Sequence, residues 1–183
     1  PYGLDTGVFL ANCSNEVDFI STWLQEEDKA LSNELVPCAM LLRLGMILLA
    51  NMLLKSGKAK EFLTENQTNN FQNVSELENQ YCGIDHVAFL GFLFDHWKFD
   101  ERLIQSITHI ENPHASSSEI KKNAYALAVT NCLFEPYNPL SSFNSKKAIA
   151  LVNEATNQGV DFNMGNFLTK LPQAAKDNLM KDD

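Results

Sequence analysis

The chain has 183 residues, of which 45% are hydrophobic and 20% are charged, and its formal net charge is −9. This length predicts one domain, or part of a larger one, with room for a substantial hydrophobic core. The negative charge argues against a broad nucleic-acid surface, because contacts with phosphates require clustered lysine and arginine side chains.

Every predicted element is a helix, so the predicted fold class is all-α. The sequence has no run of alternating β-branched residues and no Asn-Gly or Asp-Gly hairpin signal. The first helix is expected over residues 6–27, and the charged run at residues 26–29 is typical of a solvated helix end. The apolar face of this helix is formed by Phe9, Cys13, Val17, Ile20 and Leu24.

The second helix is expected over residues 33–56. Asn33 is a good N-cap residue, Pro37 is tolerable near a helix start, and Gly57 suits the position after a helix end. The helix is apolar nearly all round, which is typical of a helix buried on most sides.

Part of this helix, residues 36–54, is apolar enough to be mistaken for a membrane span. Arg43 lies near its middle, and a central arginine costs about 2.5–3.5 kcal/mol on membrane-insertion scales. The stretch also has no aromatic belt at its ends. We therefore predict a buried core helix and no membrane span.

The middle of the chain is expected to form several shorter helices. Residues 58–73 predict a short helix and a loop, and residues 75–81 predict a further helix. Asp85 and Asp100 are each expected to cap the helix that follows. The residues expected to face inward from these two helices are Val87, Leu90, Gly91, Phe94 and Trp97 on the first, and Leu103, Ile104, Ile107 and Ile110 on the second.

The last part of the chain begins with a capping box, in which Ser116 is followed three residues later by Glu119. This helix is expected to end near Phe134, before two prolines. Two final helices are expected over residues 145–157 and 164–180, the second interrupted at Pro172.

The four cysteines, Cys13, Cys38, Cys82 and Cys132, form no C-x-x-C pair, which argues against a zinc knuckle or a thioredoxin-type site. Three of them lie in apolar helical contexts, where a thiol behaves as a small hydrophobic group. The chain shows no secretory signal, so we expect a reducing, cytoplasmic location. Because the chain starts at Pro1 without a methionine, we also expect a fragment or a trimmed chain.

Two histidines, His86 and His109, lie on different predicted helices and could ligate a metal. A hydrolytic metal site, however, needs at least three protein ligands, usually including carboxylates. No further histidine or aspartate has an obvious inward position beside them. The spacing therefore predicts histidines that are exposed or hydrogen-bonded.

Three stretches carry a resemblance to a known family. They are the apolar helix at residues 40–49, the run Cys-Gly-Ile-Asp-His-Val-Ala-Phe-Leu-Gly at residues 82–91, and the segment His-Ile-Glu-Asn-Pro at residues 109–113. Over about residues 33–136 the chain resembles the HDOD domain, a degenerate relative of the HD metal-dependent phosphohydrolases. The resemblance implies an all-α helical bundle, often bacterial, with a role in signalling.

The resemblance also implies a domain organisation. Residues 1–140 would form the HDOD-like core, and residues 141–183 a helical extension packed on the same domain. HDOD domains usually continue further toward the N-terminus. If the chain is complete as given, that N-terminal half is missing from it.

Compared with HD enzymes, most metal-ligand positions are changed in this chain. Arg43 and Leu44 stand where the His-Asp doublet would be, and no early histidine occurs. His86 and His109 match two histidines of the family pattern, and Asn131 stands at the late aspartate. The fixed positive charge of Arg43 opposes a bound cation. Its partner is expected to be Asp85 or Glu111; alternatively, its guanidinium extends to solvent.

We therefore expect a non-catalytic signalling module that contacts an unidentified signalling protein. It would have no cofactor, no nucleic-acid partner and no membrane span. One alternative is a phosphohydrolase acting on nucleotides or cyclic dinucleotides. A second is a sensor that holds a small anionic ligand among Arg43, His86, His109 and Asn131. Phe89 and Phe92 either pack in the core or form a partner surface.

Overall fold

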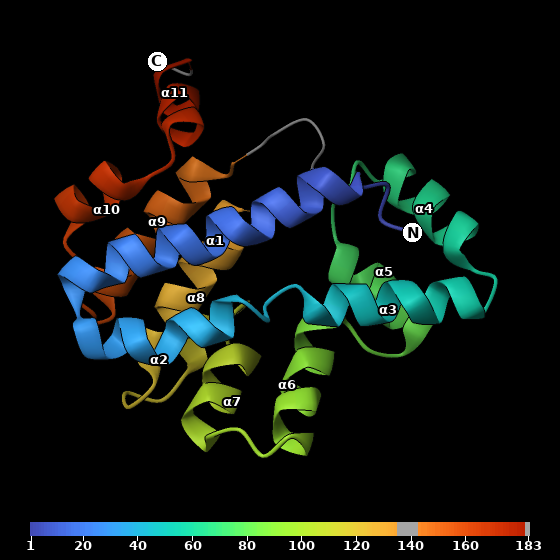
Figure 1. Ribbon diagram of the computed structural model, residues 1–183, viewed down its shortest axis with the longest axis horizontal. Coiled ribbons are helices and arrows are strands. Elements are labelled where there is room, and N and C mark those ends of the chain that lie inside the picture. The colour runs from blue at the N-terminus through green and yellow to red at the C-terminus, as the bar shows by residue number, and fades with distance from the viewer. Residues whose placement is uncertain (135–142, 182–183) are drawn as a thin grey trace.

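The computed structural model describes residues 1–134 and 143–181 and contains only helices within them, which confirms the all-α prediction (Figure 1). Its helices are α1 (Thr6–Glu27), α2 (Lys29–Ala39), α3 (Leu44–Lys55), α4 (Ala59–Thr68), α5 (Val74–Cys82), α6 (His86–His96), α7 (Glu101–Thr108), the 3₁₀ turn η1 (Pro113–Ala115), α8 (Lys121–Leu133), α9 (Ser145–Asn157), α10 (Met164–Lys170) and α11 (Gln173–Lys181). The predicted domain boundary at residue 140 lies outside the described residues.

The helices enclose two separate hydrophobic cores. The main core is formed by α1, α2 and α6–α11 and contains Trp23, whose ring lies 5.5 Å from that of Phe19 and 5.0 Å from that of Phe162. The second core is formed by α3, α4, α5 and the segment before α1. Its buried members are Tyr2, Met46, Leu53, Phe62, Val74 and Leu77.

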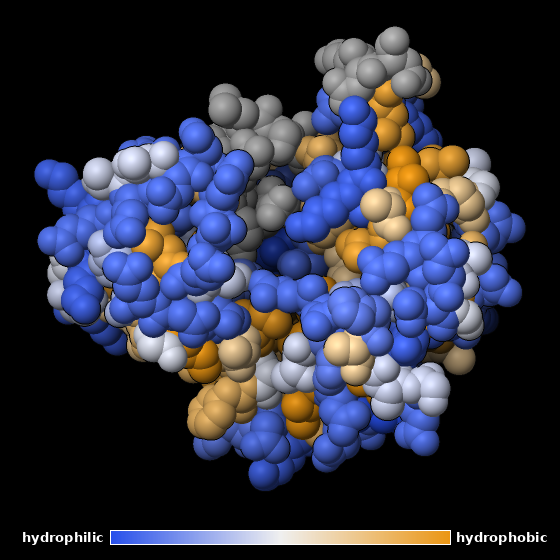
Figure 2. Space-filling view, turned by 180° about the vertical axis from the view of Figure 1, so that it is seen from behind, coloured by the Kyte–Doolittle hydropathy of each residue, from blue (hydrophilic) through white to orange (hydrophobic). Residues whose placement is uncertain are grey.

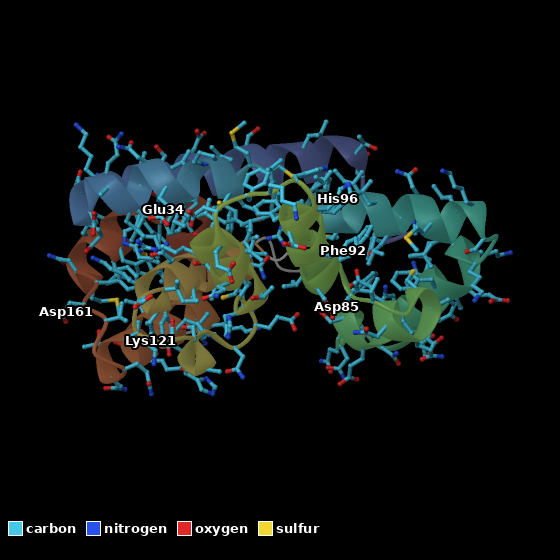
Figure 3. The ribbon with its side chains drawn as sticks, turned by 90° about the horizontal axis from the view of Figure 1, so that it is seen from below. Glu34, Asp85, Phe92, His96, Lys121 and Asp161 are labelled. Carbon is cyan, nitrogen blue, oxygen red and sulfur yellow. The ribbon has the colours of Figure 1, made fainter. Side chains whose placement is uncertain are left out.

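The helices around the two cores form two separate groups. Seen from below, α1, α2 and α3 form one layer, and the other helices lie beneath it in two groups with α6 between them (Figure 3). On one side α4 and α5 pack against α3, and on the other α8 packs against α1, α2 and α9. The contact between α3 and α6 joins the two groups.

The prediction of one helix over residues 33–56 is wrong, because the chain forms two helices there. Asp28 caps α2 by accepting hydrogen bonds from the backbone of Ala30 and Leu31, so the helix starts earlier than Asn33. It ends two residues after Pro37, whose ring lacks an N–H and crowds the preceding turn. The break at residues 40–43 lets α3 leave the main core and enter the second.

The new direction of α3 depends on Gly45. A Cβ atom at this position would lie 2.1 Å from the backbone oxygen of His86, far inside van der Waals contact. Only a glycine therefore permits α3 to cross α6 so closely. The backbone of α3 rests directly on the first turn of α6 at this crossing.

Within the described residues, one segment, Lys29–Lys55, is long and apolar enough by composition to cross a membrane. In its most apolar window, 44% of the residues are buried inside the protein. The segment consists of α2 and α3, which contribute to different cores.

Several local predictions are confirmed. Asp85 accepts a hydrogen bond from the Ala88 backbone at 2.8 Å, and Asp100 accepts one from the Arg102 backbone at 2.9 Å. Gly57 follows α3 with a φ of +74°, a conformation that glycine adopts without strain. The helix predicted over residues 145–157 has the bounds of α9, and the last predicted helix is interrupted at Pro172.

Two other local predictions are wrong. Ser116 donates its hydroxyl to the Pro113 carbonyl at 2.6 Å and so closes η1, and α8 begins at Lys121 without a side-chain cap. Trp97 is 48% exposed rather than inward. The chain turns after it, and Phe99 stacks on Phe94 at 4.3 Å and takes the inward place.

Candidate functional site

A cleft of about 580 Å³ lies where the two cores meet. Figure 2 shows the molecule hollowed between its two halves, with hydrophilic side chains in the hollow. The walls come from the α2–α3 break, the loop before α5, the start of α6, and helices α8 and α9. The polar residues that line it include Arg43, Ser75, His86, Glu111, Asn131 and Lys147.

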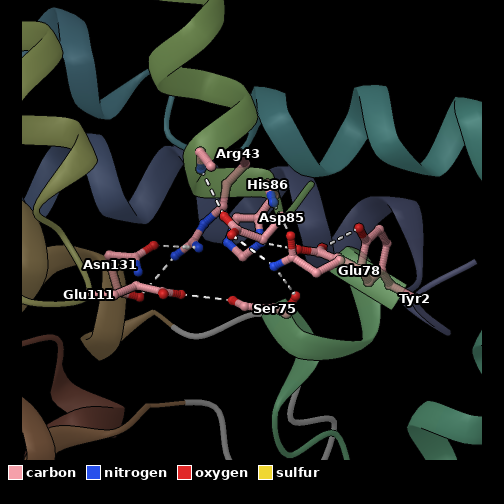
Figure 4. A network of polar contacts seen from close by, with 10 residues as sticks. Tyr2, Arg43, Ser75, Glu78, Asp85, His86, Glu111 and Asn131 are labelled. Carbon is pink, nitrogen blue, oxygen red and sulfur yellow. Dashed lines mark hydrogen bonds and ion pairs between the residues drawn. The ribbon is translucent and has the colours of Figure 1, made fainter. Parts of the chain in front are cut away.

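Arg43 is the most highly connected side chain in the cleft (Figure 4). It lies in the α2–α3 break and is only 4% exposed. Its Nε donates to Glu16 Oε1 at 2.7 Å, and its Nη2 donates to the same oxygen. Its Nη1 donates to Asn131 Oδ1 at 2.7 Å, and its Nη2 donates to the Asn131 backbone oxygen at 3.0 Å. Arg43 thus connects α1 with α8.

The expectation that Arg43 extends to solvent is therefore wrong, and among the described residues its carboxylate partner is Glu16. The two carboxylates proposed from sequence have other roles. Asp85 caps α6 and accepts a hydrogen bond from Asn79 at 3.1 Å. Glu111 accepts the Ser75 hydroxyl at 2.8 Å, a contact that links the loop after α7 to α5.

Glu16 is fully buried on α1. Burial raises the pKa of its carboxyl group, because a charge is poorly solvated there, and the adjacent Arg43 guanidinium acts in the opposite direction. Its second oxygen, Oε2, has no hydrogen-bond partner in the part of the chain that the structure describes. The positive charge of Arg43 is therefore the main compensation for this buried carboxylate.

A second buried carboxylate, Glu78 on α5, lies on the other side of His86. Its Oε1 accepts the Tyr2 hydroxyl at 2.5 Å. Its Oε2 accepts the His86 backbone N–H at 2.8 Å and lies 2.6 Å from His86 Nδ1. Because a carboxylate accepts hydrogen bonds, this contact places the shared proton on Nδ1.

The four residues proposed from sequence do not all come together. Arg43, His86 and Asn131 line the cleft, whereas His109 is not among its lining residues. His109 caps the end of α7, where its Nδ1 donates to the Gln105 backbone oxygen at 2.8 Å.

The residues of the cleft do not fit a bound metal ion. In residues 1–134 and 143–181, no group of three or more histidine, cysteine, aspartate or glutamate side chains could hold one. The Asn131 side-chain oxygen accepts from Arg43, and His86 Nδ1 faces Glu78. A guanidinium that stays protonated occupies the centre of this arrangement.

Sequence reasoning missed Glu16 and Glu78, although each carried a signal. Cys13, Glu16 and Ile20 follow a helical spacing of three and four residues, so Glu16 lies in line with the apolar face of α1. The spacing of Val74, Leu77, Glu78 and Tyr81 does the same for α5. A carboxylate inside an apolar stripe predicts a buried polar partner.

The loop before α5 adds a wall of unusual backbone conformation to the cleft. Asn70, Phe71 and Asn73 have φ angles of 51°, 57° and 58°, in the left-handed region, which asparagine adopts readily but the bulky Phe71 rarely does. All three line the cleft. Such conformations persist only where the surroundings enforce them, and they cluster at functional sites.

The comparisons with known proteins agree with this architecture. The HDOD domain family model matches residues 10–113, which is more than half of the chain. The crystal structure of a virulence factor from Campylobacter jejuni subsp. jejuni is similar, with 49% sequence identity and a TM-score of 0.89. The match covers 97% of this chain and 66% of that one, so the chain spans just under two-thirds of the length of that relative. No curated protein matches. The chain belongs to the HDOD domain family.

Proposed function

We propose that this chain is a non-catalytic signalling or regulatory module that acts through protein contacts in a bacterial signal transduction pathway. The observation that carries the proposal is the buried group of Arg43, Glu16 and Asn131. It lies where, by the family resemblance, HD phosphohydrolases carry their metal-binding doublet and late aspartate.

Electrostatics supports the proposal. A phosphohydrolase of this kind uses a cation to activate water and to stabilise charge on the phosphate. Here Arg43 contributes a permanent positive charge that is 4% exposed. The one carboxylate in this group, Glu16, is already paired with the Arg43 guanidinium. Asn131 contributes no further negative charge, so little attraction is left for a second cation nearby.

Exposed apolar side chains support the protein-contact part of the proposal. Phe92 on α6 is 62% exposed, and Trp97 at the end of the same helix is 48% exposed. Figure 3 shows Phe92 pointing away from the main core, on the side of α6 that faces α5. Aromatic residues are enriched at protein–protein interfaces, so α6 is the first place to look for a partner surface.

The test is to measure metal content and phosphodiesterase activity on protein purified without chelator. We expect iron, manganese and zinc well below one equivalent, and no hydrolysis of bis-p-nitrophenyl phosphate with added Mn²⁺. Near-stoichiometric metal that is lost in both His86→Ala and His109→Ala would overturn the proposal. His96→Ala is the matched control, because His96 is exposed at the end of α6.

A sensor is the second candidate, and the cleft of about 580 Å³ favours it. A small anionic ligand there would meet Lys147, which is exposed at the cleft, and the Arg43 side of the wall. The test is thermal unfolding with a panel of nucleotides and organic acids. A rise in Tm that is lost in Lys147→Ala and kept in the control Lys55→Ala would support it. No shift across the panel would exclude this second function.

A further inference from the structure

The segment before α1 is fitted closely to the second core. Tyr2 is 5% exposed, and its ring packs edge-on against Phe62 with centroids 5.2 Å apart. Gly3 follows with a φ of +69°, and a Cβ atom there would lie 3.0 Å from Leu63 Cδ1. Leu4 packs against the same core. The segment therefore needs Tyr2 for its anchor and Gly3 for its close approach to α4.

The hydroxyl of Tyr2 connects this segment to the cleft through one carboxylate. Glu78 accepts the Tyr2 hydroxyl with Oε1, and it accepts the backbone and ring N–H groups of His86 with Oε2. Glu78 is fully buried and His86 is 3% exposed. Because both oxygens are engaged, removing the donor on one side changes the charge and orientation that the other side meets.

His86 is also the place where the two cores touch. Its backbone oxygen lies against Gly45, at the crossing of α3 and α6. Its side chain lines the cleft together with Arg43. A shift of His86 would therefore change both the crossing of the helices and the wall of the cleft.

We propose that residues 1–5 form a latch that regulates the cleft. In the latched state Tyr2 fills the second core and, through Glu78, holds His86 in place. In the released state Tyr2 leaves the core, Glu78 loses its hydroxyl donor, and His86 and the start of α6 loosen. A partner that displaces this segment would open the cleft side of His86, and binding at the cleft would in turn bias the segment.

The proposal rests on the sensor function proposed for the cleft, but its test reads His86 directly and needs no partner or ligand. The test compares Tyr2→Phe with Tyr81→Phe. Tyr81 is a matched control because its ring also packs edge-on against Phe62, at 5.6 Å, and its hydroxyl also bonds a carboxylate, Glu65, at 2.9 Å. It differs in having no bond to Glu78.

The readout is the amide hydrogen-exchange rate of His86, divided by that of the most slowly exchanging amides of α8. The ¹⁵N chemical shifts of the His86 ring are recorded alongside it. In Tyr2→Phe we expect His86 to exchange about tenfold faster relative to α8, since one hydrogen bond to a charged group changes the opening equilibrium by that order. Tyr81→Phe should leave the ratio unchanged.

The reciprocal variant, Glu78→Gln, should loosen both His86 and Tyr2, because an amide cannot accept all three donors. The latch is overturned if the exchange ratio of His86 to α8 stays at its wild-type value in both Tyr2→Phe and Glu78→Gln. It is equally overturned if Tyr81→Phe changes that ratio as much as Tyr2→Phe does.

Discussion

Replacement of Arg43 by methionine tests whether the buried ion pair is the centre of the site. Methionine keeps an unbranched apolar stem but removes the positive charge that faces Glu16. The Glu16 carboxyl group is fully buried, and its Oε2 has no hydrogen-bond partner among residues 1–134 and 143–181. In Arg43→Met its Oε1 also loses the guanidinium, so the carboxyl group must either stay charged without a partner or take up a proton.

Proton uptake limits the cost. From the ordinary carboxyl pKa of 4.5, protonation at pH 7 costs 2.5 units times about 1.36 kcal/mol, or about 3.4 kcal/mol. The lost bond to Asn131 adds about 1 kcal/mol. In Arg43→Met the pKa of Glu16 is higher in the folded state than in the unfolded state. Glu16 therefore destabilises this variant more as the pH rises, and the variant is relatively more stable at low pH. Protonation and the lost bond together cost about 4.4 kcal/mol at pH 7. At pH 5.5 protonation costs about 1.4 kcal/mol, so the sum falls to about 2.4 kcal/mol.

The assay is equilibrium unfolding in urea at pH 7.0 and pH 5.5. The matched control is Arg102→Met, because Arg102 is the other arginine of the chain and is exposed on α7; we expect a change within about 0.5 kcal/mol. The double variant Arg43→Met, Glu16→Leu should be more stable than Arg43→Met alone, since it removes the unpaired charge. A cost for Arg43→Met below about 1 kcal/mol at pH 7, or an equal cost at both pH values, would refute the reasoning.

Three further predictions follow from single contacts. Gly45→Ala should destabilise the protein by more than about 3 kcal/mol in urea unfolding, because the new Cβ would meet the backbone of His86. The control Gly91→Ala should cost far less, because its Cβ would meet only the Thr108 side chain, at 2.7 Å. Burial raises the pKa of the Cys38 thiol to about 12, so iodoacetamide at pH 8 should alkylate Cys38 about a thousandfold more slowly than an unperturbed thiol. A rate for Cys38 in the native protein that is comparable to that of an unperturbed thiol would contradict this. Hydrogen bonds from the α2 backbone hold the pKa of Asp28 below its usual value, so Asp28→Ala should cost about 1 kcal/mol at pH 7 and less as pH falls below 4; a cost independent of pH would exclude a charged cap.

Features that depend on a few neighbouring residues could be predicted from the sequence. The caps at Asp85 and Asp100 and the bounds of α9 are of this kind, because a cap needs only its own side chain and the next two or three N–H groups. The capping box at Ser116 shows the limit of this reasoning. The same hydroxyl could serve η1 or α8, and only the folded chain selects η1.

Features that depend on distant segments could not be predicted. The break between α2 and α3 places Arg43 beside Glu16 and Asn131, which are 27 and 88 residues away in sequence. A helix pattern shows that a residue faces inward but not which helix it meets. The pattern therefore leaves open whether Arg43 is buried, and it does not single out Glu16 over Asp85 or Glu111 as its partner.

On the proposed function, the buried group around Arg43 makes the connection between helices that a metal ion makes in a metal-dependent enzyme. A metal site draws several helices together through negative or neutral ligands around an exchangeable cation. In this chain the positive charge belongs to the side chain of Arg43, which directly precedes α3, and its hydrogen-bond acceptors come from α1 and α8. A guanidinium does not lose its proton and, being covalently attached, cannot leave the site as a metal ion can. On the other face of the cleft, His86 is held by Glu78, and the two cores meet at Gly45.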